Sequence, residues 1–130
     1  MKIEKGFEEA KFKKIAQKCD NKQLVKDISY MRVAIHNGSK IYAEALDDYA
    51  FFVGYHNKDH FRLVGIGVDV ACRGKGYGRF MLQRALTYAK AQGYRQVRTR
   101  SKSGVDFYQR WGGARIADVK DDDYMLVMDI

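Results

Sequence analysis

The chain has 130 residues and a mass of 15.0 kDa, the size of one domain with its own core. Its 46% hydrophobic and 31% charged residues are typical of a folded soluble protein and exclude a disordered one. No stretch approaches the ~20 apolar residues of a membrane span, the N-terminus lacks an apolar signal region, and two cysteines make neither a disulfide framework nor a metal set. We therefore expect a single cytoplasmic domain over residues 1–130, with no membrane partner and no metal.

The first thirty residues predict one strand and two helices. Alternating residues over 1–5 indicate a short strand. Apolar residues at helical spacing over 7–19, with lysines and glutamates between them, indicate a helix. Asn21 is a suitable N-cap for a second, short helix.

Two hairpins are expected next. The dipeptide at 37–38, Asn-Gly, is typical of a two-residue hairpin turn, so we predict strands over 32–36 and 40–46. The first of these segments could instead prolong the preceding helix. Residues 49–56 and 60–70 are rich in β-formers and predict a further hairpin.

The second half predicts β-α-β-α-β-β. The clearest helix covers 78–92, with Gly93 suited to the position after its C-cap, and a strand follows at 96–102. Ser103 and Asp106 fit a capping box for a short helix. Two final strands, 114–119 and 124–130, are expected to pair around an acidic turn. The whole order predicts a mixed α/β domain.

The net charge of +8 is concentrated in one segment of this second half. Nine basic residues and no acidic residue lie between Asp69 and Asp106, and the remainder of the chain is close to neutral. Such a segment is typical of a solvated cationic face, a nucleic-acid patch or a site for a phosphate-bearing ligand. The nine are Arg73, Lys75, Arg79, Arg84, Lys90, Arg95, Arg98, Arg100 and Lys102.

A glycine-rich turn precedes the long helix within this basic segment. Glycine reaches positive φ and lets a ligand approach the backbone amides. The first turn of the following helix offers unpaired N–H groups and the positive end of its dipole. The turn therefore predicts a phosphate site, formed by Arg73, Gly74, Lys75, Gly76, Tyr77, Gly78 and Arg79.

Two segments resemble motifs of the GNAT superfamily of N-acetyltransferases. R-G-K-G-Y-G at 73–78 resembles the R-x-x-G-x-G signature that binds the acetyl-CoA pyrophosphate, and S-K-S-G-V-D-F-Y-Q-R-W-G at 101–112 resembles N-x-x-A-x-x-(L/F)-Y-x-(K/R)-x-G. The resemblance covers about residues 60–130. It implies a central mixed, mostly antiparallel sheet with flanking helices, acetyl-CoA as cofactor, and direct acetyl transfer to an amine.

The resemblance also implies roles for individual residues. The strand end formed by Val68, Asp69 and Val70 would contact the pantetheine arm of the cofactor, and the amides of 74–79 would hold the pyrophosphate. Tyr108 matches the usual general acid. Ser101 stands where asparagine is usual, which implies a lost or shortened hydrogen bond.

No general base stands out from the sequence. The candidates are Glu44, Asp69, His60 and His36. Glu44 is the favoured candidate because strand carboxylates near the acceptor cleft serve in this way in relatives, and a relay of ordered waters is equally consistent.

Three functions follow from these patterns. The leading interpretation is an N-acetyltransferase acting on the amine of a small molecule or a protein. The alternatives are a protein that acts on or binds nucleic acid through the basic segment 73–102, and a CoA-binding regulatory module without turnover. The acceptor is not specified, and both a monomer and a homodimer remain open.

Overall fold

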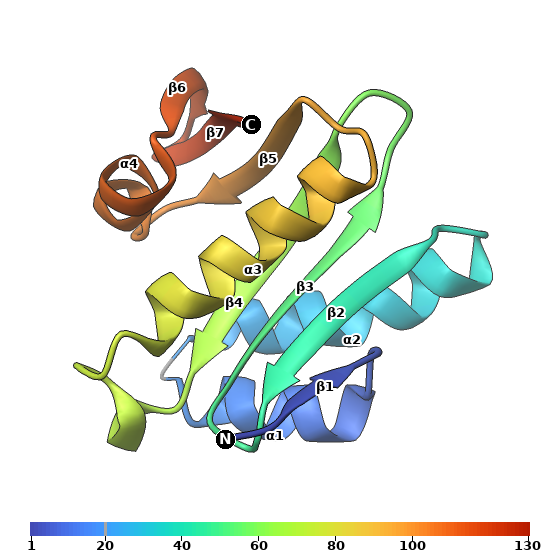
Figure 1. The fold of residues 1–130 in the computed structure, drawn as a ribbon, viewed down its shortest axis with the longest axis vertical. Coiled ribbons are helices and arrows are strands. Elements are labelled where there is room, and N and C mark those ends of the chain that lie inside the picture. Colours follow the sequence, from blue (N-terminus) through green and yellow to red (C-terminus); the bar gives the residue numbers. More distant parts are fainter. Residues whose placement is uncertain (20) are drawn as a thin grey trace.

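The computed structural model describes residues 1–19 and 21–130. Within them one seven-stranded sheet has the order β1-β2-β3-β4-β5-β7-β6, and only β4 and β5 are parallel neighbours (Figure 1). This mixed, mostly antiparallel sheet with flanking helices confirms the predicted fold class. The elements are β1 (Ile3–Lys5), α1 (Glu9–Gln17), α2 (Lys22–His36), β2 (Ile41–Leu46), β3 (Ala50–His56), β4 (Phe61–Val68), the 3-10 helix η1 (Val70–Cys72), α3 (Tyr77–Ala91), β5 (Gln96–Ser101), α4 (Val105–Gly112), β6 (Arg115–Lys120) and β7 (Asp123–Asp129).

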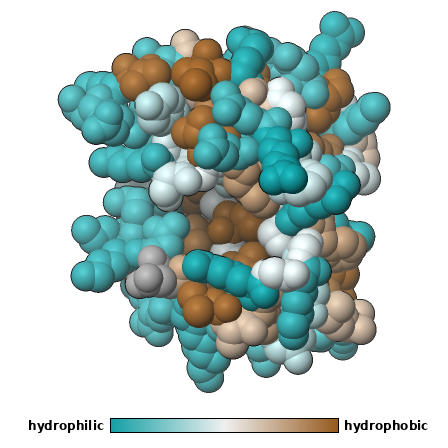
Figure 2. Space-filling model, turned by 90° about the vertical axis from the view of Figure 1, so that its left-hand side faces the viewer, coloured by the Kyte–Doolittle hydropathy of each residue, from teal (hydrophilic) through white to brown (hydrophobic). Residues whose placement is uncertain are grey.

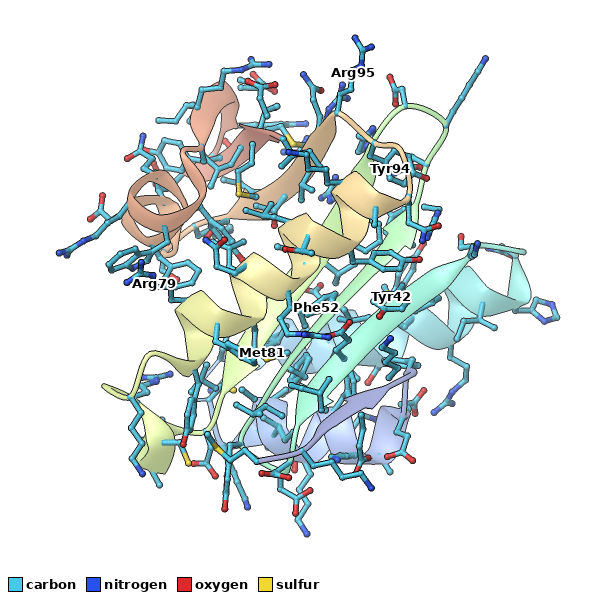
Figure 3. The ribbon with its side chains drawn as sticks, viewed as in Figure 1. Tyr42, Phe52, Arg79, Met81, Tyr94 and Arg95 are labelled. Atoms are coloured by element: carbon cyan, nitrogen blue, oxygen red, sulfur yellow. The ribbon has the colours of Figure 1, made fainter. Side chains whose placement is uncertain are left out.

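Helices cover both faces of the sheet, so the protein has two apolar cores. The helices α1 and α2 lie on one face and α3 lies across the other, with α4 beside it (Figure 1). Adjacent residues on β3 point to opposite faces, which places Phe51 in the α1–α2 core and Phe52 in the α3 core. Figure 3 shows Phe52 and Met81 between α3 and the sheet. No helix among the described residues is long and apolar enough to cross a membrane.

The strand predicted over 32–36 is wrong, because α2 continues through these residues to His36. The Asn-Gly dipeptide ends this helix instead of turning a hairpin. Gly38 has a φ of 87° and donates to the Ile35 carbonyl at 3.0 Å, and Ser39 donates to the Ala34 carbonyl at 2.9 Å. A helix C-terminus and a hairpin turn both need positive φ, so the dipeptide alone does not distinguish them. The predicted cap is confirmed: the Asn21 side chain accepts from the Leu24 amide at 3.1 Å.

Two smaller predictions also require correction. The strand predicted over 60–70 ends at Val68, and Val70 opens η1 with its amide donating to the Lys18 carbonyl at 3.0 Å. The capping box of Ser103 and Asp106 is absent from the described structure, where α4 has Gly104 as its N-cap without a side-chain bond. The final hairpin is confirmed. Its turn needs positive φ, which Asp121 (53°) and Asp122 (61°) adopt.

Candidate active site

The two parallel strands of the sheet separate along their length. The strands β4 and β5 pair only at Phe61–Val97 and Arg62–Arg98. Beyond these pairs β4 continues to Val68 beside β3, and β5 continues to Ser101 beside β7. The sheet therefore opens into a gap toward the C-terminal ends of β4 and β5.

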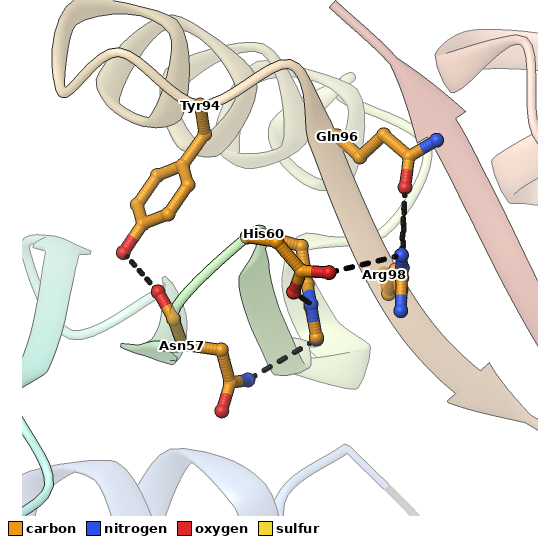
Figure 4. Close-up of polar contacts among 6 residues, drawn as sticks. Asn57, His60, Tyr94, Gln96 and Arg98 are labelled. Carbon is orange, nitrogen blue, oxygen red and sulfur yellow. Dashed lines mark hydrogen bonds and ion pairs between the residues drawn. The ribbon is translucent and has the colours of Figure 1, made fainter.

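A polar network joins the strands at the closed end of this gap (Figure 4). The Tyr94 hydroxyl donates to the Asn57 carbonyl at 2.8 Å, and Asn57 Nδ2 lies 3.1 Å from His60 Nε2. Because Nδ2 only donates, His60 Nε2 accepts, and its Nδ1 donates to Asp59 at 2.8 Å. Asp59 in turn lies 3.9 Å from the Arg98 guanidinium on β5. His60 is thus a structural residue at the base of the gap.

The open end of the gap holds a cavity of about 890 Å³. Figure 2 shows a hollow near the centre of one face, with hydrophobic residues at its floor and hydrophilic residues around it. The cavity extends from the glycine turn to α2. Its wall near the turn includes Val68, Arg73, Gly78, Ser101 and Tyr108. The structure therefore brings together five of the site residues expected from the sequence.

The glycine turn presents a row of free backbone donors beside this cavity. Gly74 and Gly76 have φ values of 82° and 81°, and a Cβ at either would be strained even though the space is open. The first hydrogen bond of α3 runs from the Phe80 amide to the Gly76 carbonyl at 3.0 Å. In the described part of the chain, no hydrogen bond uses the amides of residues 74–79. This arrangement is the anion-binding geometry of a helix N-terminus.

The two arginines that flank the turn are held by the protein itself. The Arg73 guanidinium donates to the Cys19 carbonyl. The Arg79 guanidinium lies 4.1 Å from the centre of the Trp111 ring, so it points toward α4 (Figure 3). These contacts fix the position of both guanidinium groups, while the backbone amides at 74–79 lie on the cavity side without a partner among the described residues.

Tyr108 on α4 lies in the cavity wall and is only 7% exposed. Burial raises the pKa of its hydroxyl to about 12, because the phenolate would lose hydration. Ser101, in the same wall, accepts from the Gly104 amide at 2.7 Å and fixes the loop before α4. Tyr108 thus keeps its proton at neutral pH.

Glu44 is not part of the cavity. It lies on β2, two strands from the gap and beneath α3, and is 2% exposed. Arg84 from α3 donates to one carboxylate oxygen and the Tyr42 hydroxyl donates to the other. Asp69 instead caps η1, accepting from the Ala71 amide at 2.9 Å. The structure therefore does not bring either carboxylate together with Tyr108.

The strand β4 contains a bulge that its sequence pattern did not predict. Val53 pairs with Gly65 and Gly54 pairs with Leu63, so Val64 has no partner in β3, and the β4–β5 pairing has already ended. The bulge changes which way the strand faces: Val64 packs against the α1–α2 core, whereas Ile66 packs against the α3 core. The sequence signal was Gly65, whose added Cβ would lie 2.5 Å from Leu24 Cδ1. The cavity passes through the sheet at this point.

Several cations of the basic segment 73–102 are paired with carboxylates in the folded protein. Arg84 pairs with Glu44, Arg98 lies 3.9 Å from Asp59, and Arg100 lies 3.7 Å from Asp123. These carboxylates come from other parts of the chain. The tertiary structure therefore neutralises three of the nine cations.

Comparisons with known proteins identify the family. The profile of the acetyltransferase (GNAT) domain matches residues 26–112. Among solved structures, aminoglycoside 6'-acetyltransferase type Ii is similar, with a TM-score of 0.76 and 14% sequence identity. The match covers 99% of this chain and 97% of the aminoglycoside acetyltransferase chain. The PaiA N-acetyltransferase of Thermoplasma acidophilum, in complex with coenzyme A, is similar with a TM-score of 0.71 and 14% sequence identity, and the match covers 100% of both chains.

A third solved structure, a GNAT family acetyltransferase of Elizabethkingia anophelis with acetyl-CoA bound, is similar at a TM-score of 0.69 and 14% identity, covering 99% and 97%. Among curated protein sequences none matches this chain significantly. The structural likeness confirms the fold, and the profile match covers more than half of the chain. The chain belongs to the GNAT family of acetyltransferases.

Proposed function

We propose that this protein is an acetyl-CoA-dependent N-acetyltransferase that transfers an acetyl group directly to an amine. The observation that carries the proposal is the row of free amides at 74–79 beside a cavity that separates β4 from β5. Membership of the GNAT family and the coenzyme A complexes of similar structures support it. A cytoplasmic location is part of the proposal, and the two free cysteines, Cys19 and Cys72, fit a reducing compartment.

The residues around the gap suit a long ligand with a diphosphate group. The amides of 74–79 would bind the diphosphate, and the unpaired edge of β4 near Val68 would bind the arm that follows. Val70 would contribute only its side chain, because its amide is bonded to Lys18. The bound cofactor supplies an acetyl group activated as a thioester. Ser101 would position the loop before α4 rather than contact the cofactor, since its hydroxyl oxygen already accepts from Gly104.

Three elements of the chain would assist the transfer. The backbone at the bulge, where Val64 has no register partner in β3, would be suited to donate an amide to a carbonyl oxygen that gains negative charge. The Tyr108 hydroxyl holds a proton that it can donate to an anionic leaving atom. Arg79, held over Trp111, adds positive charge near the turn. For the proton released by the amine we propose transfer to water in the cavity, because Glu44 is buried beneath α3.

The test has a binding arm and a turnover arm. Acetyl-CoA at 100 times its dissociation constant is expected to stabilise the fold by about 2.7 kcal/mol in a thermal unfolding experiment. Absence of both a calorimetric signal and a thermal shift would refute the cofactor assignment. Tyr108→Phe should retain acetyl-CoA binding and lower kcat for amine acetylation by about 10²–10⁴-fold. Tyr124→Phe on β7 is the matched control and should leave kcat unchanged.

The turnover measurement tests the first alternative, and a DNA titration at several salt concentrations tests the second. A regulatory module would bind acetyl-CoA without releasing thiol in the presence of any amine. A nucleic-acid-binding protein would bind duplex DNA with an affinity that falls steeply with salt, because phosphate contacts release counterions. The pairing of Arg84, Arg98 and Arg100 with carboxylates argues against this second alternative.

A further inference from the structure

The half of the cavity beyond the β4 bulge has a different character from the half beside the glycine turn. Val68 and Arg62 are six residues apart on β4, a separation of about 20 Å at ~3.3 Å per residue. The distant half therefore lies well away from the phosphate-binding turn. We call it the acceptor half, and its polar lining includes Asp27, Tyr30, Tyr55, Arg62, Arg100 and Asp123.

Arg62 is the cation of the acceptor half that forms no ion pair with a described carboxylate, and Asp27 and Asp123 act on it only at longer range. Arg100 is paired with Asp123 at 3.7 Å, and Arg98, on the neighbouring strand, lies 3.9 Å from Asp59. In the described part of the chain, neither an ion pair nor a side-chain hydrogen bond involves Arg62. Partial burial lowers the pKa of its guanidinium, because the cation loses hydration. A half-buried guanidinium with five unused donors would be stabilised by an anion entering the cavity.

We infer that the amine acceptor carries a carboxylate, which binds to the Arg62 guanidinium, so that the substrate class is amino acids or peptides with a free carboxylate. This inference rests on the proposed acetyltransferase function and deepens it. The planar fork of arginine matches a carboxylate with two parallel hydrogen bonds.

The surroundings of Arg62 favour an acceptor that carries both charges. Tyr55 is the register partner of Arg62 on β3, so their side chains are neighbours on one face and the Tyr55 hydroxyl is a second donor nearby. Asp27 and Asp123 in the same wall would attract a cationic amine. A purely cationic acceptor such as a polyamine would find Asp27 and Asp123 but would bring no anion to the Arg62 guanidinium. The charge pattern thus matches a zwitterion.

The experiment compares acceptors that differ only in the carboxylate. Thiol release is measured with a set of L-amino acids, with the carboxamide of each, and with spermidine. We expect kcat/KM for the carboxylates to exceed that for the matching amides by at least tenfold. In Arg62→Gln, kcat/KM for the carboxylates should fall 10- to 100-fold, mainly through KM, while the values for the amides change less than threefold. Arg62→Lys should give an intermediate loss, because it keeps the charge without the fork.

Arg98→Gln is the matched control. It removes an arginine from the strand beside Arg62, but one that lies outside the cavity wall and already has partners, and it should change both acceptor classes less than threefold. Equal rates with carboxylates and amides in the unaltered protein, or equal losses in Arg62→Gln, would overturn the inference. Acetyl-CoA binding is measured in every variant. If binding is retained and amides react as well as carboxylates, only this inference fails, whereas absent binding refutes the acetyltransferase itself.

Discussion

Arg84 on α3 donates a hydrogen bond to Glu44 on β2, and the Glu44 carboxylate that accepts it is 2% exposed. Helical spacing places Arg84 on the polar side of α3, yet its guanidinium reaches back to the sheet. The Tyr42 hydroxyl donates to the other oxygen of Glu44. The Tyr42 ring stacks on the Tyr88 ring, with ring centres 3.4 Å apart. The carboxylate that family resemblance favoured as a general base is therefore satisfied within the α3–sheet interface.

Removing the arginine should destabilise the fold strongly. In Arg84→Met, the Glu44 charge is left buried without its cation, and we expect a loss of about 3 kcal/mol in the free energy of unfolding, measured by urea denaturation. The double variant Glu44→Gln, Arg84→Met should recover most of this loss. Glu44→Gln alone should leave kcat of the folded enzyme within threefold. A 100-fold decrease of kcat in Glu44→Gln would contradict this expectation and would indicate that Glu44 is the general base.

Gly78→Ala tests the cofactor turn without disturbing the fold. The added Cβ would lie 3.4 Å from Phe107 Cε1 and 3.6 Å from Val68 Cγ2, which is ordinary contact, so thermal stability should hardly change. All three residues line the cavity, and the methyl group takes space beside the free amides. We expect at least a tenfold weaker acetyl-CoA affinity by calorimetry.

Gly93→Ala is the control for that variant. Gly93 follows α3 with a φ of 92° and lies outside the cavity wall, so alanine there should cost about 1 kcal/mol of stability and leave the affinity unchanged. The opposite pattern, with a stable Gly78→Ala protein that binds acetyl-CoA normally, would place the diphosphate elsewhere.

The raised pKa of Tyr108 predicts a stability change at alkaline pH. The pKa of this tyrosine is 10 in its unperturbed state and about 12 in the folded protein, so the folded state binds the proton more tightly. Its contribution to stability is fully present below pH 10 and is lost as the pH rises from 10 to 12, up to about 3 kcal/mol. Chemical denaturation across this range should show a shallower decline in Tyr108→Phe than in the unaltered protein. Parallel curves would contradict burial of an ionisable hydroxyl at this position.

Thr99 offers a test of stability inside the core. Its hydroxyl is buried, the residue is 1% exposed, and its polar neighbour is the Tyr108 hydroxyl, with which it makes no hydrogen bond of good geometry among the described residues. Thr99→Val should therefore raise the free energy of unfolding by at most about 1 kcal/mol, because it removes a buried, poorly satisfied polar atom without changing the shape. Thr99→Ser keeps the hydroxyl, loses a methyl group and should be less stable. Destabilisation by valine would mean that the hydroxyl is satisfied.

Local sequence determined much of the fold and the cofactor turn. Helical periodicity, the Asn21 cap and the glycines at 74–78 act over a few residues, so their patterns are readable without the rest of the chain. The same locality explains the failure at 37–38. A positive φ at Gly38 is compatible with the end of a helix and with a hairpin turn. Which of the two forms depends on the packing of α2 against the rest of the chain.

Contacts between distant segments were decided by the tertiary structure alone. The pairing of Glu44 with Arg84 and of Arg100 with Asp123 depends on which strands become neighbours, not on sequence spacing, and so does the lack of an ion pair at Arg62 among the described residues. The gap exists because β4 stops pairing with β5 after Arg62, and the bulge at Val64 then leads the cavity through the sheet. The sequence by itself thus determined the elements and the anion-binding turn, whose causes are local backbone conformations. The acceptor half and the fate of each buried charge depend on non-local packing, which no local pattern encodes.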